Sequence, residues 1–181
     1  MIKKIFEYYK IPLLISIFLS ITVLALTLEK NALNISLIIA GALLGSFFLD
    51  LDYLLYAFFL EPKADFSITL AGHLKNKEYR SALAYIHYHK NDIGDKTLNS
   101  ALFQVVLAGA SLLVVSSSSS YLVKLLVLSA FVNSLYRLAE HYYEGNTGLW
   151  FWALKVKPDK RATIYYSAAL VAILILSLAL I

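Results

Sequence analysis

Hydrophobic residues form five long runs along this chain, and polar residues are concentrated between the runs. A helix needs about 20 apolar residues to cross the hydrocarbon core of a bilayer, and each run comes near that length. The pattern therefore predicts an all-α polytopic membrane protein in which residues 1–181 form one integral membrane domain. The five predicted transmembrane helices are residues 11–28, 32–53 with an apolar extension to 60, 98–115, 121–138 and 163–181.

The two long segments between these runs, residues 61–97 and 139–162, are polar and should lie on the same side of the membrane. Asn76 is predicted to cap a helix that runs to about residue 90. Its apolar residues recur at i, i+3, i+4 and i+7, which is typical of an amphipathic helix lying in the membrane interface. These residues are Tyr79, Ala82, Leu83 and Ile86.

Composition and charge agree with a membrane protein and give it an orientation. Hydrophobic residues make up 60% of the chain, and cysteine is absent, which excludes disulfides and thiolate metal sites. With the N-terminus in the cytoplasm, only Lys30 and Lys124 of the 16 Lys and Arg residues lie outside. Because cytoplasmic loops carry the positive excess, we predict a plasma (inner) membrane protein with its N-terminus inside and its C-terminus outside. This rule explains the spread of basic residues, so we expect no nucleic-acid partner.

Two carboxylates, Asp50 and Asp52, stand near the end of the second apolar run and are the first candidates for chemistry. A charged side chain at the centre of a membrane costs about 2.5 to 3.5 kcal/mol on insertion scales, so such residues are functional candidates. On an unbroken helix the two side chains point about 200° apart, so they can share one ion only if the helix distorts or ends there. Gly41 and Gly45, at GxxxG spacing, share a stripe with Asp52 and favour close approach of a neighbouring helix.

A second group of polar residues is predicted on the same inner side. Asn133, Arg137, His141 and Glu144 recur at i, i+4, i+8 and i+11 along the fourth run, and Glu140 adds a carboxylate beside His141. His with carboxylates suits zinc, iron or manganese, whereas an arginine repels a cation and pairs with a carboxylate. These residues therefore have two alternative interpretations, a metal site and a structural ion pair. His87 and His89, in the preceding polar segment, are further candidate metal ligands.

With these features the chain resembles a family of small membrane-bound, metal-dependent hydrolase-like proteins of the inner membrane, over residues 41 to about 158. The resemblance rests on the DxD at Asp50 and Asp52, the polar start of an apolar helix at Asn99, the pair Asn133 and Arg137, and a Trp-rich segment. That segment, residues 149–152, should also anchor at the interface. The family commonly has histidines at the places of Asn99 and Asn133 and a carboxylate at the place of Arg137.

The resemblance implies hydrolysis of a phospho- or acyl-ester at the inner leaflet. Asp50, Asp52 and His141 would then be catalytic, and Asp50 and Asp52 with His87 and His89 would hold a divalent zinc, manganese or magnesium ion. Asn99, Asn133, Arg137, Glu140 and Glu144 would have structural or substrate-binding roles.

The departures from the family pattern leave a second function open. A hydrolytic metal centre needs several firm ligands and one open position, and arginine is never a ligand. The chain can therefore be a non-catalytic scaffold or small subunit that has lost its metal, with Arg137 paired to Asp50 or Asp52. Expected partners are membrane lipid and a protein partner or a second copy of the chain.

Overall fold

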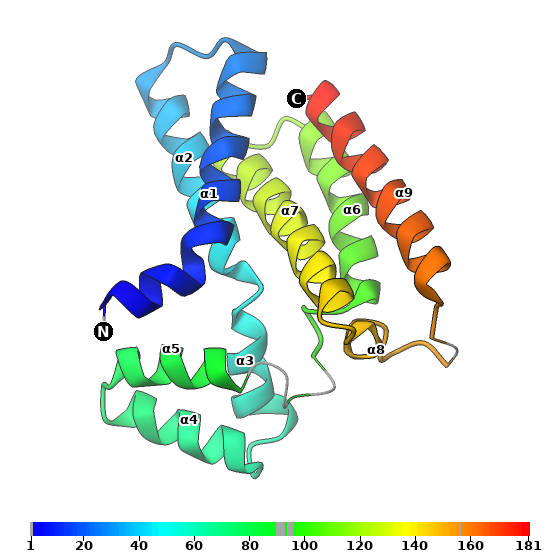
Figure 1. Ribbon diagram of the computed structural model, residues 1–181. Coiled ribbons are helices and arrows are strands. Elements are labelled where there is room, and N and C mark those ends of the chain that lie inside the picture. The colour runs from blue at the N-terminus through cyan, green and yellow to red at the C-terminus, as the bar shows by residue number, and fades with distance from the viewer. Residues whose placement is uncertain (1, 90–92, 94–95, 156) are drawn as a thin grey trace.

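The computed structural model describes residues 2–89, 93, 96–155 and 157–181, with side chains from Tyr9 onward except that of His87. Every regular element in these ranges is a helix, which confirms the all-helical prediction. Figure 1 shows helix α7 in the middle of the fold, between α1 and α2 on one side and α6 and α9 on the other. The elements are α1 (Ile2–Thr27), α2 (Ala32–Phe48), α3 (Leu51–Leu55), the π-helix η1 (Tyr56–Leu60), α4 (Asp65–Lys75), α5 (Tyr79–Tyr88), α6 (Ala101–Ser116), α7 (Tyr121–Tyr143), α8 (Thr147–Trp150) and α9 (Lys160–Ala179).

Three of the described helices are long and apolar enough to cross a membrane, in α1, α7 and α9. A fourth crossing is counted if α2 and residues 51–60 form one span, which is bent by 47°. Helix α6 has 16 residues, about 24 Å of helix at 1.5 Å per residue, and falls short of the roughly 30 Å hydrocarbon core. Membrane insertion is thus supported, while the count of five crossings and the side of each terminus stay predictions.

Helices α2 and α7 form the central contact of the bundle, and two glycines permit it. A Cβ atom on Gly41 would overlap the backbone carbonyl oxygen of Leu122 on α7. On Gly45 it would lie 2.5 Å from the Leu126 carbonyl oxygen and 2.6 Å from the Ser129 Cβ atom. The GxxxG spacing therefore brings the α2 backbone directly against α7, as small residues do in membrane helix pairs.

Buried hydroxyl groups join α1 to this pair. The Ser16 hydroxyl lies 2.6 Å from the Ser46 Oγ and 2.8 Å from the Ser129 Oγ, and Ser129 donates to the Ala42 carbonyl. The Asn133 Nδ2 atom donates to the Ser129 carbonyl over 2.9 Å and to the Ser16 Oγ over 3.2 Å. These bonds join buried polar groups of three helices at one level, while the Asn133 Oδ1 atom accepts no hydrogen bond from the described residues.

Helices α4 and α5 form a hairpin next to α3 at one end of the fold (Figure 1), and its position on the cytoplasmic side stays a prediction. Asn76 ends α4 instead of capping α5, and Lys77 turns the chain with a positive φ of 59°. The expected cap is therefore wrong. In α5, Ala82 and Ile86 are buried in a cluster that includes Phe66 and residues of α3 and η1, so part of the apolar stripe packs within the protein. A position of α5 in the membrane interface stays a prediction.

Two residues of the Trp-rich segment differ from the sequence prediction, whereas Trp152 is 38% exposed and its place at an interface stays a prediction. Trp150 is 0% exposed and Phe151 is 2% exposed, so these rings belong to the core instead of anchoring at an interface. The Trp150 indole donates to the Gln104 side chain of α6 over 3.1 Å, and the Tyr166 hydroxyl of α9 bonds the same oxygen. A buried indole needs such a partner, and Gln104 supplies it. Because the Gln104 side chain gives the Trp150 indole a hydrogen-bond acceptor inside the protein, this ring can be buried and does not need the polar membrane interface.

Candidate functional site

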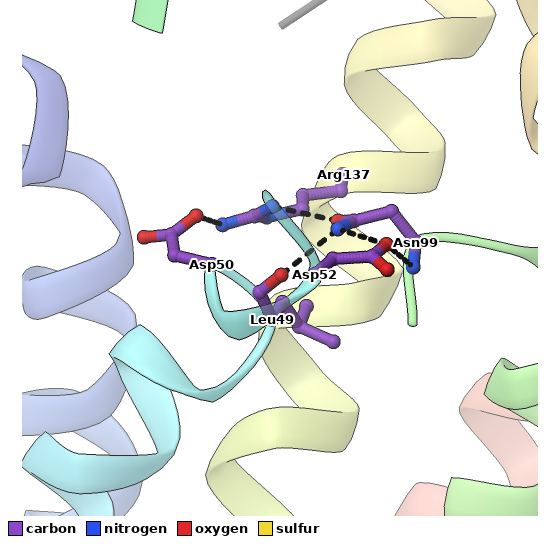
Figure 2. Close-up of polar contacts among 5 residues, drawn as sticks. All are labelled: Leu49, Asp50, Asp52, Asn99 and Arg137. Carbon is purple, nitrogen blue, oxygen red and sulfur yellow. Dashed lines mark hydrogen bonds and ion pairs between the residues drawn. The ribbon is translucent and has the colours of Figure 1, made fainter. Parts of the chain in front are cut away.

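The acidic pair lies where the second apolar run breaks. Helix α2 ends at Phe48 and α3 begins at Leu51, so Asp50 occupies the junction and Asp52 the first turn of α3. Because the helix does not continue, the 200° separation expected for an unbroken helix does not apply. Both carboxylates instead contact segments that follow later in the chain (Figure 2).

Asp52 is fully buried, and its carboxylate is held by nitrogen donors from the segment before α6. The Thr97 backbone N–H donates to Oδ1 over 3.0 Å. The Asn99 backbone N–H and its side-chain Nδ2 both donate to Oδ2, over 2.8 Å and 2.9 Å. A buried carboxylate requires such donors, and these three use both of its oxygens.

Asn99 and Arg137 connect the two carboxylates into one chain of bonds. The Asn99 side chain also donates to the Leu49 carbonyl over 2.9 Å, which ties it to the broken helix. Arg137 donates from Nη1 to the Asn99 Oδ1 over 2.6 Å and from Nη2 to the Asp50 Oδ1 over 2.5 Å. The order is Asp50, Arg137, Asn99, Asp52 (Figure 2). This network links α2, α3, α7 and the start of α6.

A cavity of about 80 Å³ opens beside this network. Its wall includes most of the polar residues predicted to gather on the inner side of the membrane. Tyr9 of α1, Lys96 and Tyr136 also contribute to it. The predicted residues on its wall are Asp50, Asn99, Arg137, Glu140, His141 and Glu144.

Other predicted site residues lie elsewhere. Asn133 belongs to the buried hydroxyl network of α1, α2 and α7. His89 follows α5, where its ring packs at 4.4 Å from the Tyr85 ring, and it does not line the cavity. The side chain of His87 lies outside the described residues.

The donor set does not match a metal centre. Among the residues described by the structure, no three His, Asp or Glu side chains gather in a group able to hold a metal ion. Both oxygens of Asp52 accept N–H groups, and Oδ1 of Asp50 is bound by a guanidinium. A hydrolytic metal needs several firm ligands with one open position, which this arrangement does not offer. Metal binding by Asp50, Asp52 and the histidines stays a prediction.

Sequence reasoning missed the tyrosines and the lysine of the site. Tyr9 lies beside Asp50 and interacts with its carboxylate, and Lys96, only 3% exposed, lies with its Nζ 5.6 Å from the Tyr53 ring centroid. Tyr136 donates to Glu140 at the long distance of 3.5 Å. Tyr136 lies four positions before Glu140 on α7, so this i, i+4 spacing to a predicted site residue could have drawn attention to it. Tyr9 and Lys96 carried no such signal.

Comparisons with protein-family models, with curated proteins and with solved structures found no match to this chain.

Proposed function

We propose that this chain is a non-catalytic membrane scaffold or small subunit, in which the acidic pair has a structural role. The observation that carries the proposal is the pairing of Arg137 with Asp50. The guanidinium occupies the position next to Asp50 that a cationic metal would need. Its charge repels a divalent ion, and its planar fork suits a carboxylate.

The burial of the network supports the same proposal. The side chains of Arg137 and Asp50 are only 14% and 17% exposed, and Asp52 is fully buried behind Asn99. A catalytic carboxylate must reach substrate, cofactor or a reacting water, and Asp52 has both oxygens committed to backbone and amide donors. The network joins four elements of the fold, which is what a structural role requires.

The test is a comparison of metal content, metal response and activity. The chain is purified in detergent without chelator, its metals are measured by mass spectrometry, and its unfolding temperature is followed on adding zinc, manganese or magnesium. We expect less than stoichiometric metal and no rise in unfolding temperature, since a ligand stabilises only the state that binds it. Phospho- and acyl-ester substrates in lipid vesicles should be cleaved no faster than with an Arg137→Gln, Asp50→Asn variant.

The alternative is the hydrolase implied by the family resemblance, and the same experiment distinguishes it from a scaffold. One bound metal per chain that is lost in the Asp50→Asn protein, together with ester cleavage, would overturn the scaffold proposal. Cross-linking in intact membranes supplies the positive readout. A defined larger species containing the chain supports a scaffold, whereas a chain recovered only as a monomer contradicts it.

A further inference from the structure

Helices α7 and α9 leave a groove of about 380 Å³ between them. Both helices are long and apolar enough to cross a membrane, so a groove between them opens toward the hydrocarbon of a bilayer. On α9 its wall extends from Thr163 to Val171, a rise of about 12 Å. One leaflet contributes about 15 Å to the hydrocarbon core, so the groove is long enough to hold most of one acyl chain.

The wall of this groove is apolar, although it contains two hydroxyl groups. The Thr163 hydroxyl donates to the Asp159 carbonyl over 2.9 Å, and the Ser167 hydroxyl donates to the Thr163 carbonyl over 2.9 Å. Both donors are therefore used within α9. No carboxylate of the described residues lines the groove, because Glu140 and Glu144 line the separate cavity beside Asp50.

Lys160, the first residue of α9, stands at one end of the groove. At about 100° per residue it lies about 15° from the centre of the α9 positions that line the groove, whereas Arg161 lies about 90° away from that centre. The Lys160 side chain is exposed and forms no ion pair with a carboxylate within the described ranges. An apolar groove thus ends beside a cation that the fold does not neutralise.

This end of the groove has the composition of a membrane boundary. Charged residues occupy positions 159–161, and residues 163–181 contain none. Helix α7 ends where α9 begins (Figure 1), so Tyr142 and Tyr143 line the same end of the groove. Tyrosine is enriched at the level of lipid headgroups, and Tyr143 is 87% exposed. The Lys160 ammonium is therefore placed at headgroup level, whichever side of the membrane it faces.

From these observations we infer that the groove binds an anionic phospholipid, with one acyl chain between α7 and α9 and the headgroup phosphate beside the Lys160 ammonium. Lys155 and Lys157, both exposed in the preceding segment, add to the positive potential that attracts an anionic headgroup. A zwitterionic headgroup brings its own cation next to Lys160, and an apolar helix of a partner would fill the groove without neutralising it. This inference goes beyond the proposed function and does not depend on it.

The test titrates the full chain, freed of bound lipid in detergent, with phosphatidylglycerol, phosphatidylethanolamine and phosphatidylcholine of identical acyl chains. Native mass spectrometry counts the bound lipids. We expect phosphatidylglycerol to bind about tenfold more tightly than the other two, and this preference to shrink as salt rises from about 0.1 M to about 0.5 M. Equal binding of the three lipids, or a preference that salt does not change, would overturn the inference.

Two glutamine variants test the position of the charge. Lys160→Gln and Arg161→Gln each remove one positive charge, the first in line with the groove and the second about 90° around α9. We expect Lys160→Gln to lose most of the preference for phosphatidylglycerol, and both Arg161→Gln and Lys160→Arg to keep it. An equal loss in the two glutamine variants would indicate a general attraction of basic residues to an anionic surface and would contradict a site.

Two phenylalanine variants test the groove. Ala168 lines it, whereas its exposed neighbour Ala169 does not. Ala168→Phe should weaken the binding of all three lipids several-fold, and Ala169→Phe should leave it unchanged. Each variant must first unfold at the temperature of the parent without lipid, and Ala168→Phe is otherwise replaced by Ala139→Phe on the α7 wall. Unchanged binding to a variant with a filled groove would overturn the inference.

A soluble headgroup and a cross-link exclude the other occupants. Glycerophosphoglycerol at millimolar concentration should leave the unfolding temperature unchanged, because most of the lipid contact lies in the groove, and stabilisation equal to that by the lipid would overturn the inference. The chain has no cysteine, so Ala168→Cys introduces a single thiol. Oxidative linkage of two copies through this thiol in membranes would place protein in the groove and contradict a lipid. A larger species joined elsewhere supports the scaffold and leaves the groove to lipid, so the two proposals can fail separately.

Discussion

Arg137 donates through Nη2 to Oδ1 of Asp50, a residue 87 positions earlier in the chain. Removing one partner of a buried ion pair leaves an uncompensated charge, at a cost of about 3 to 5 kcal/mol. We therefore expect Arg137→Gln to lower the unfolding temperature strongly. Asp50→Asn with Arg137→Gln should unfold closer to the parent than Arg137→Gln alone, because the double variant contains neither charge.

Arg161→Gln is the matched control for this pair, because Arg161 is exposed at the start of α9. Its unfolding temperature should equal that of the parent in the same detergent. A double variant as unstable as the sum of both single variants would show that the two side chains act independently and would contradict a structural pair.

Asn99 is predicted to be the most sensitive neutral residue of the network. Asn99→Ala removes bonds to the Leu49 carbonyl, to Asp52 and from Arg137, and we expect a loss of about 1 to 3 kcal/mol in unfolding free energy. Asn99→Asp should be worse, since it places a carboxylate against Asp52. Asn34→Ala, which removes a bond to Glu29 near the surface, should have a small effect in the same denaturation series.

The contact between α2 and α7 predicts opposite outcomes for two glycines. Gly41→Ala places a methyl group on the Leu122 backbone carbonyl, which cannot move aside as a flexible side chain would, so the helices must separate. Gly109→Ala in α6 meets no atom within 4 Å and should stabilise by about 0.5 to 1 kcal/mol through helix propensity. The measurement compares the unfolding temperatures of the two variants with that of the parent. Equal changes for Gly41→Ala and Gly109→Ala would contradict the close packing of α2 against α7.

The loop between α1 and α2 provides a prediction about pH. The backbone N–H of Asn31, followed by the Asn34 side chain, lowers the pKa of Glu29 below its ordinary value. A carboxylate with a lowered pKa stabilises the folded state above the pKa of the unfolded chain, and this contribution disappears as pH falls through the folded value. Glu29→Gln should therefore unfold slightly below the parent at pH 7, and the difference should vanish in acid. A difference that grows in acid would contradict the assignment.

The starts of several helices were predictable because their signals are local. Helix α2 begins at Ala32 and α7 at Tyr121, where the runs were predicted to begin. The Asn31 side chain accepts the Leu33 N–H, a local capping bond that the sequence contains within three residues. The helix breaks between Phe48 and Leu51, and periodicity alone did not show whether it would continue or end at Asp50.

The site was only partly predictable because its contacts join distant segments. Arg137 was considered as a partner for Asp50 on chemical grounds, and the structure contains that pair. Asn99, by contrast, lies outside α6 and folds back on Asp52 because Ser100 caps the helix. The burial of Trp150 depends on Gln104 in another helix, so the usual preference of tryptophan for interfaces did not hold. Such contacts depend on tertiary structure.

The separation of Asp50 from Arg137 has a consequence for biogenesis. A ribosome adding about 5 to 20 residues per second needs several seconds to pass from the acidic residue to its counter-ion. If α2 and residues 51–60 form one span, this segment enters the membrane during that interval with the Asp50 carboxylate uncompensated, which is costly. Nascent chains arrested before α7 should therefore be retained by the insertion machinery or degraded, and release into the bilayer should coincide with the synthesis of Arg137.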